Sequence, residues 1–331
     1  MAKFHGLLCL ASGRAPDNGY DHPQLHLNLW EQVDRISLDI GLMIRRDFSS
    51  PEIYFYLPWP KADKALMDLT PRINDADAIA AVFNESWEVT RLPRSSSATV
   101  KDPSSGKVLF QVISPSNYWS IEDETPQSHR IKLDFGRLVK TEPLEAEEIY
   151  LRFRVKGVPK EFYAVGFAQG DQGLVSSWTK NEFIDFRLNV RRGAPPDLEA
   201  HVGHYVSFSK VHLFLMRHRS NELVFQDSAF RSCRSLEDEH FWAKYSHDDE
   251  QPSPEQLRDA RSHVVNSLGY QWTKRTNEGL PTHEFGILAR FKRIELSIPK
   301  FIFYAVLISA AGNAAWTILS WLYTTLTTPK P

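Results

Sequence analysis

From Phe301 to Leu326 the chain carries no charged side chain. About 20 consecutive apolar residues, rising about 1.5 Å each in a helix, cross the hydrocarbon core of a bilayer. Core helices of soluble domains are seldom free of charge over such a length. The run therefore predicts one transmembrane helix, over residues 300–327, followed by a short tail at 328–331.

Cations lie mainly on the N-terminal side of this span. One cation, Lys330, follows it, whereas four precede it closely: Arg290, Lys292, Arg293 and Lys300. By the positive-inside rule the N-terminal side is expected in the cytoplasm. The apolar stretch Leu7–Ala11 is too short for a secretory signal. The sequence thus predicts a single-pass, tail-anchored membrane protein with a cytoplasmic N-terminal domain.

Small residues occupy the middle of the span. Ser309 and Gly312 would let a second helix approach closely, and the amide of Asn313 would seek a partner in hydrocarbon. These three residues are candidate contacts for a homo-oligomer. The alternative is that Asn313 bonds to its own helix backbone and that the helix only anchors the protein.

The remainder has the composition of a globular protein. Lys and Arg number 39 against 41 Asp and Glu, and aromatic residues make up 12%, which excludes a disordered or collagen-like chain. The balanced charge gives no overall attraction to nucleic acid or anionic lipid. Two cysteines, Cys9 and Cys233, provide neither a disulfide framework nor a thiolate metal site.

Alternation with period two dominates the first 245 residues. In Arg35–Arg46, Ile36, Leu38, Ile40, Leu42 and Ile44 fall on one face, and similar patterns occur in 149–155 and 184–190. Many short strands between Pro, Gly, Asp and Ser clusters predict an α+β fold, mainly β, built as an antiparallel sandwich or barrel.

A few helices are expected as well. Asp75–Trp87 has an apolar stripe, Ser253–Gln256 reads as a capping box, and shorter helices are predicted at Gln24–Val33 and Lys61–Leu69. The polar segment Ser246–Glu255 suggests a boundary. We therefore expect a β-rich domain at 1–245 and a neck of helix, strand and basic juxtamembrane segment at 246–299.

Two predicted strands carry cations on their polar faces. If these strands were neighbours, they would form a basic surface for a phosphate group, a nucleic acid or an acidic protein. The alternative is an ordinary solvated sheet face. The candidate residues for this anionic-partner surface are Arg152, Arg154, Lys156, Arg187, Arg191 and Arg192.

The juxtamembrane segment Leu288–Ile294 mixes cations with apolar residues. Such a segment either rests on anionic headgroups, at about 1 kcal/mol per cation, or forms a terminal β-strand of the soluble domain.

Common catalytic motifs are absent, so no catalytic residue, metal ligand or cofactor is assigned. His22 and His26 have a metal-ligand spacing on a helix, but Pro23 lies between them and they are interpreted as surface histidines. Carboxylate runs at 145–148, 237–239 and 248–250 leave a metal-dependent nuclease or another hydrolase open as an alternative.

The layout resembles that of membrane effectors in prokaryotic antiviral defence, where a soluble recognition domain is joined to a short transmembrane region that oligomerises. This resemblance concerns arrangement and involves no shared motif. It implies a domain that binds a protein partner or ligand and couples it to the bilayer. A membrane-tethered enzyme and a non-catalytic nucleic-acid-binding module are the alternatives.

Overall fold

The computed structural model describes residues 6–13, 22–32, 36–62, 65–92, 97–167, 179–191, 198, 202–227, 230–247, 252–275, 281–294 and 298–327. Within these ranges the fold is mainly β, as predicted, with three sheets and no closed barrel. Neighbouring strands are antiparallel except in the pairs β15–β2 and β11–β8.

The largest sheet runs in the order β17-β18-β15-β2-β3-β11-β8-β7-β6, with β5 also paired to β11. Its strands are β17 (Phe230–Ser235), β18 (Ser267–Arg275), β15 (Lys210–His218), β2 (Gln24–Glu31), β3 (Ile36–Arg45), β11 (Glu148–Lys156), β8 (Val108–Val112), β7 (Ala98–Lys101), β6 (Glu88–Arg91) and β5 (Leu66–Asp68).

Two smaller sheets complete the domain. The five-stranded sheet consists of β14 (His204–Tyr205), β1 (Leu8–Ala11), β4 (Glu52–Leu57), β10 (Ser128–Asp134) and β9 (Trp119–Thr125). The four-stranded sheet consists of β12 (Ala164–Phe167), β13 (Thr179–Leu188), β19 (Phe285–Ile294) and β16 (Glu222–Gln226).

The described helices are α1, α2, α4, α5 and α6, with two short 3₁₀ turns. Their bounds are α1 (Ala76–Phe83), α2 (Phe135–Thr141), α4 (Glu239–Ser246), α5 (Pro254–Val265), α6 (Ile298–Thr327), η1 (Thr70–Arg72) and η2 (Lys160–Phe162). The predicted capping box at the start of α5 is confirmed: the side chains of Ser253 and Gln256 each accept a hydrogen bond from the other's backbone.

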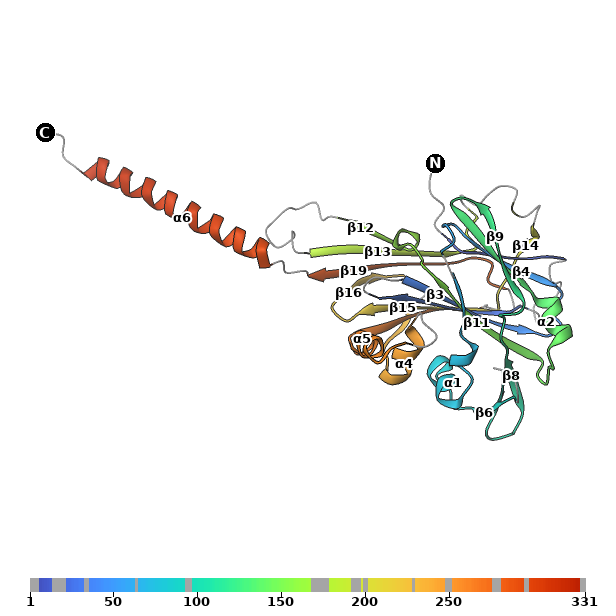
Figure 1. The fold of residues 1–331 in the computed structure, drawn as a ribbon. Coiled ribbons are helices and arrows are strands. Elements are labelled where there is room, and N and C mark those ends of the chain that lie inside the picture. The colour runs from blue at the N-terminus through green and yellow to red at the C-terminus, as the bar shows by residue number, and fades with distance from the viewer. Residues whose placement is uncertain are drawn as a thin grey trace.

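Apolar side chains from all three sheets meet in one core. The rings of Phe55 on β4 and Phe153 on β11 lie 5.7 Å apart, and those of Tyr270 on β18 and Phe291 on β19 lie 5.0 Å apart. The opposite face of the ten-stranded sheet packs against α1, α4 and α5, which cover it in Figure 1. The central strands β15, β2, β3 and β11 are therefore buried on both faces, whereas β17 and β6 are partly exposed.

Two predicted helices are strands instead. Gln24–Val33 contains β2, a central strand between β15 and β3, and its Leu25, Leu27 and Leu29 are fully buried. Their period of two, which buries one face of a strand, prevails over helix propensity. In Lys61–Leu69 the structure shows the short strand β5, whereas residues 63 and 64 lie outside the described ranges.

Two strands of the predicted neck at 246–299 pair with strands of the predicted β-rich domain at 1–245. β18 pairs with β15 from end to end, and β19 pairs with β13 in the same way. Both strands contribute to the common core. The juxtamembrane segment Leu288–Ile294 belongs to β19. Of its two predicted alternatives, a strand of the soluble domain is therefore the one observed.

β19 ends at Ile294, and α6 begins at Ile298 and extends away from the sheets (Figure 1). The most apolar 18 residues of its stretch Phe301–Thr327 have a mean hydropathy of 1.6, and the stretch is long and apolar enough to cross a membrane. None of the most apolar part of this stretch is buried against the described domain.

Candidate functional site

The helix-covered face of the ten-stranded sheet carries several buried polar side chains, among them Asn28, Asp39, Arg152, Arg154 and His212. Residues in register on neighbouring strands point to the same side of a sheet. Across β15, β2, β3 and β11 they form three rows on this face: Lys210, Gln24, Met43 and Tyr150; His212, His26, Gly41 and Arg152; Phe214, Asn28, Asp39 and Arg154.

From the first two rows, five residues line the floor of a cavity: Lys210, Gln24, Met43, His212 and His26. Its volume is about 1160 Å³, and its other walls come from the C-terminal end of α1, from β8 and from β17. Ligand pockets commonly measure about 300–1,000 Å³, so this cavity has room for a ligand with several groups. We call it the α1 pocket.

Two histidines meet in this floor. The rings of His26 and His212 lie 5.1 Å apart, and His212 Nδ1 is 2.9 Å from Thr273 Oγ1. Burial, and then the positive charges of Lys210, Arg231 and Arg275, lower the pKa of His212 to about 3. Burial also holds the pKa of His26 well below its usual value. Both rings are therefore neutral near pH 7 and present one donor and one acceptor nitrogen each.

Aromatic rings line the α1 pocket on two sides of the histidines. Phe83 lies 5.6 Å from His26, and Trp87 stacks obliquely on Phe83 at 5.4 Å. On the other side, Phe214 lies 6.4 Å from His212. Phe83, Trp87 and Phe214 are all half-buried, so part of each ring faces the pocket.

Three cations stand together along one edge of the pocket. Lys210 on β15 is the register partner of Arg275 on β18, and Arg231 comes from the neighbouring strand β17. Burial lowers the pKa of Lys210, and the charges of Arg275 and Arg231 lower it further. Among the described residues, none of the three forms an ion pair with a carboxylate. This edge is a local excess of positive charge.

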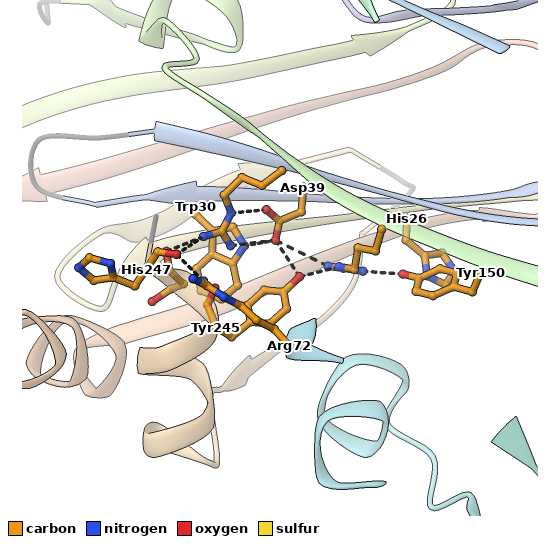
Figure 2. Close-up of polar contacts among 10 residues, drawn as sticks. His26, Trp30, Asp39, Arg72, Tyr150, Tyr245 and His247 are labelled. Carbon is orange, nitrogen blue, oxygen red and sulfur yellow. Dashed lines mark hydrogen bonds and ion pairs between the residues drawn. The ribbon is translucent and has the colours of Figure 1, made fainter. Parts of the chain in front are cut away.

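The third row continues as a buried polar network beneath α4 (Figure 2). Arg154 donates to both carboxylate oxygens of Asp39, at 2.6 and 3.1 Å, and both side chains are completely buried. Trp30 Nε1 and Tyr245 Oη donate to Asp39 Oδ2 at 2.8 and 2.9 Å. One carboxylate thus satisfies groups from β2, β11 and α4.

The same network holds the C-terminal end of α4. Arg154 Nη1 donates to the carbonyl of Ser246 at 2.7 Å, and Arg72 Nη1 donates to the carbonyls of Tyr245 and His247. The last carbonyls of a helix have no partner within the helix and carry partial negative charge. The buried guanidinium group of Arg154 and the half-buried side chain of Arg72 satisfy them here, so both residues hold α4 in place.

Arg152 links this network to the α1 pocket. Its Nε donates to Tyr245 Oη at 2.5 Å and its Nη1 to Tyr150 Oη at 2.6 Å; Tyr150 Oη lies 3.4 Å from His26 Nδ1 (Figure 2). Burial opposes the charge of Arg152, but Tyr150, Tyr245 and Asp39 favour it, and its pKa is raised. A Cβ at position 41 would collide with the Tyr150 hydroxyl, so Gly41 makes room for this link.

Those described residues of the predicted anionic-partner surface that lie in strands belong to different sheets. Arg152 and Arg154 are completely buried in the ten-stranded sheet, with Lys156 half-buried at the end of β11. Arg187 lies in the four-stranded sheet paired with Asp185, and Arg191 stacks on Tyr205 at 4.8 Å. Arg192 lies outside the described residues. β11 and β13 belong to different sheets, so their cations are not brought together.

The residues predicted to act in oligomerisation or next to the membrane lie on α6 and β19. Ser309, Gly312 and Asn313 are exposed on α6. On β19, Arg290 Nη2 donates to Asn181 Oδ1 at 3.0 Å, Lys292 is half-buried and Arg293 is exposed. The side chain of Lys300 lies outside what the structure describes.

The α1 pocket was not predicted. His26 was interpreted as a surface histidine on a helix, whereas it lies on β2 beside His212, 186 positions away in the sequence. No local sequence pattern predicts that His26 and His212 lie side by side. Within the described ranges, no group of three or more His, Cys, Asp and Glu side chains is placed to hold a metal ion.

No known family profile and no curated protein matches this chain. One solved structure with some similarity is the Fcho1 Mu homology domain of Danio rerio with a bound Eps15 peptide. The identity is 8%, the match covers 87% of this chain and 80% of the other, and the TM-score is 0.16. A similarity at this level carries no argument about fold or function.

Proposed function

We propose that this chain is a membrane-attached binding protein. In this proposal the β-rich domain is a sandwich, with the ten-stranded sheet facing the two smaller sheets across their shared core, and it binds a ligand in the α1 pocket. Helix α6 anchors it in a bilayer with the domain in the cytoplasm. The observation that carries the proposal is the apolar, unburied surface of α6 directly after the last strand of the domain.

The physical argument concerns α6. Its exposed apolar side chains include Phe303, Ile308 and Leu319, each with more than half of its surface exposed. Burying one such side chain is worth about 1.5–3 kcal/mol, so a helix with many of them needs an apolar environment. A bilayer supplies it over the full length, and the cations Arg290, Lys292 and Arg293 just before the helix favour a cytoplasmic domain.

Charges placed in the middle of α6 test the anchor. With Ile308→Arg and Ile318→Arg combined, each arginine opposes insertion by about 2.5–3.5 kcal/mol, so we expect the protein to leave the membrane fraction. Wild type should stay in that fraction after washing with high salt and alkaline carbonate. Val265→Arg, at an exposed position on α5, is the matched control and should fractionate as wild type does.

The same membranes report orientation. Cys233 is exposed and Cys9 is buried, so an impermeant maleimide reports on Cys233 in the native domain. In intact cells we expect no labelling, and after lysis full labelling. Wild type in the soluble fraction would contradict the anchor, and labelling of intact cells would contradict the orientation alone.

Self-association of α6 is the stronger form of the proposal, in which the chain acts as a membrane effector of the antiviral kind. An exposed amide in hydrocarbon gains about 0.6–2 kcal/mol from a partner helix. Asn313→Leu is therefore expected to reduce crosslinked oligomers, and any toxicity on overexpression, about 3-fold to 30-fold. Thr317→Val is the control, because the Thr317 hydroxyl is bonded within its own helix. Unchanged crosslinking and toxicity in Asn313→Leu would leave α6 as an anchor only.

A further inference from the structure

The α1 pocket combines two kinds of surface that one class of ligand matches. We infer that it binds a nucleotide, with phosphate groups at Lys210, Arg231 and Arg275 and an aromatic base against Phe83, Trp87 and Phe214. This inference deepens the proposed function, because it assigns a ligand class to the domain that α6 would anchor.

The three cations at one edge of the α1 pocket match the phosphate groups of a nucleotide. Burial and then the positive charges of Arg275 and Arg231 lower the pKa of Lys210, and the described chain offers the three cations no carboxylate. Three cations held at one edge of a cavity are unfavourable without an anion, and phosphate oxygens accept hydrogen bonds from guanidinium and ammonium groups. The acidic residues of the pocket lie elsewhere in its lining: Glu85 follows α1, and Glu145, Glu147 and Glu148 come from the start of β11 and the segment just before it.

The aromatic rings in the floor and walls of the α1 pocket match the base of a nucleotide. Four rings follow one another across the floor, in the order Phe83, His26, His212 and Phe214. The centres of successive rings lie 5.6, 5.1 and 6.4 Å apart. Because both histidines are neutral, the floor is an aromatic platform with donor and acceptor nitrogens for a base edge, beside the phosphate site. A base stacked on aromatic side chains gains about 1–3 kcal/mol by alanine substitution, for any of the four bases. A simple anion would leave these rings unused.

The α1 pocket is large enough to hold a whole nucleotide. At about 1160 Å³ the cavity exceeds the usual range for small-molecule pockets, so phosphates and a base fit in it together. A lipid headgroup has the phosphate but no aromatic ring. An acidic peptide has carboxylates, which three converging cations bind as well, but it does not require the histidine floor.

The test uses the full chain in detergent micelles and isothermal titration with ATP, GTP, CTP and UTP, with tripolyphosphate and the four nucleosides as separate arms. We expect at least one triphosphate to bind about tenfold or more tightly than both tripolyphosphate and its own nucleoside. Arg275→Glu should weaken that binding at least tenfold, and Trp87→Ala about tenfold.

Lys274→Glu is the matched control for Arg275→Glu. It reverses the same charge on the same strand, but neighbouring strand residues point to opposite faces, and Lys274 bonds instead to the carbonyl of Glu284 at 2.9 Å. We expect it to bind as wild type does, and all variants should keep the wild-type melting temperature within a few degrees.

Three outcomes would overturn the inference: no binding of any triphosphate at millimolar concentration, equal binding of tripolyphosphate, or equal loss of binding in Lys274→Glu. Retained membrane fractionation alongside any of these results would reject the nucleotide while leaving the membrane-attached binding protein intact. Nucleotide binding by a protein that is absent from the membrane fraction would reject the membrane anchor and leave the nucleotide site intact.

Discussion

Asp39→Asn is expected to lower the free energy of unfolding by about 3–5 kcal/mol, the usual effect of removing one partner from a buried ion pair. Asparagine keeps the shape of the side chain but removes the charge that faces Arg154 and Arg152. Both guanidinium groups are completely buried, so water does not replace the lost carboxylate. Tyr245 and Trp30 lose a charged acceptor at the same time.

The effect should be visible first at α4, because Asp39 holds Tyr245 while Arg154 holds the carbonyl of Ser246. Urea unfolding followed by tryptophan fluorescence suits this case, since Trp30 and Trp242 pack beside the network with their rings 5.6 Å apart. Asp47→Asn is the control. It breaks the exposed pair with Arg45, and such pairs contribute less than about 1 kcal/mol. Equal stability of the two variants would show that the network adds nothing to folding.

The alternation of β3 shows what the sequence could and could not predict. Leu38, Ile40 and Leu42 were placed on one face, and the structure buries that face in the main core. The other face carries Asp39 and Gly41, and the structure buries it as well. Periodicity divides a strand into two faces, but it does not show whether a segment far along the chain covers the second one.

The same reason explains the basic faces. Arg152 and Arg154 alternate correctly with Leu151 and Phe153 on β11, so the strand itself was predicted. Their burial depends on α4, which lies more than eighty positions later and covers this part of the sheet. Asp39 and Arg154 are register partners on β3 and β11, and that complementarity becomes readable only when the strand order is known.

A second charged cluster joins the ten-stranded sheet to the strand that leads into α6. Arg217 on β15 pairs with Glu31 on β2 and with Glu182 on β13, and its guanidinium carbon lies 5.0 Å from the centre of the Phe291 ring on β19. Lys160 reaches the other oxygens of the two glutamates at 3.0 and 2.9 Å. Arg217 itself is nearly completely buried, with 3% of its side chain exposed.

Arg217→Leu is expected to lower the free energy of unfolding by about 3 kcal/mol, because the two carboxylates then face each other with Lys160 alone. Their partial exposure puts the value at the low end for buried pairs. Hydrogen exchange should show the loss locally, with faster exchange of the β19 amides than of the β3 amides. Arg219→Leu, at an exposed position two residues further on, should change stability by less than about 0.5 kcal/mol.

The pH dependence separates a charge effect from a packing effect. Burial raises the pKa of Glu182, but Arg217 and Lys160 lower it more, so it lies below its usual value of about 4.5. In wild type this carboxylate contributes stability above that pH, and the contribution is lost as the pH falls through the lowered pKa.

Without Arg217 the pKa of Glu182 rises, and the folded variant binds a proton at a higher pH than folded wild type does. Acidification therefore favours the variant relative to wild type, and the stability difference should be largest near pH 7–8 and shrink toward pH 4. Urea unfolding at several pH values measures it. A difference that stays constant from pH 8 to pH 4 would mean that Arg217 acts through packing on Phe291 and not through its charge.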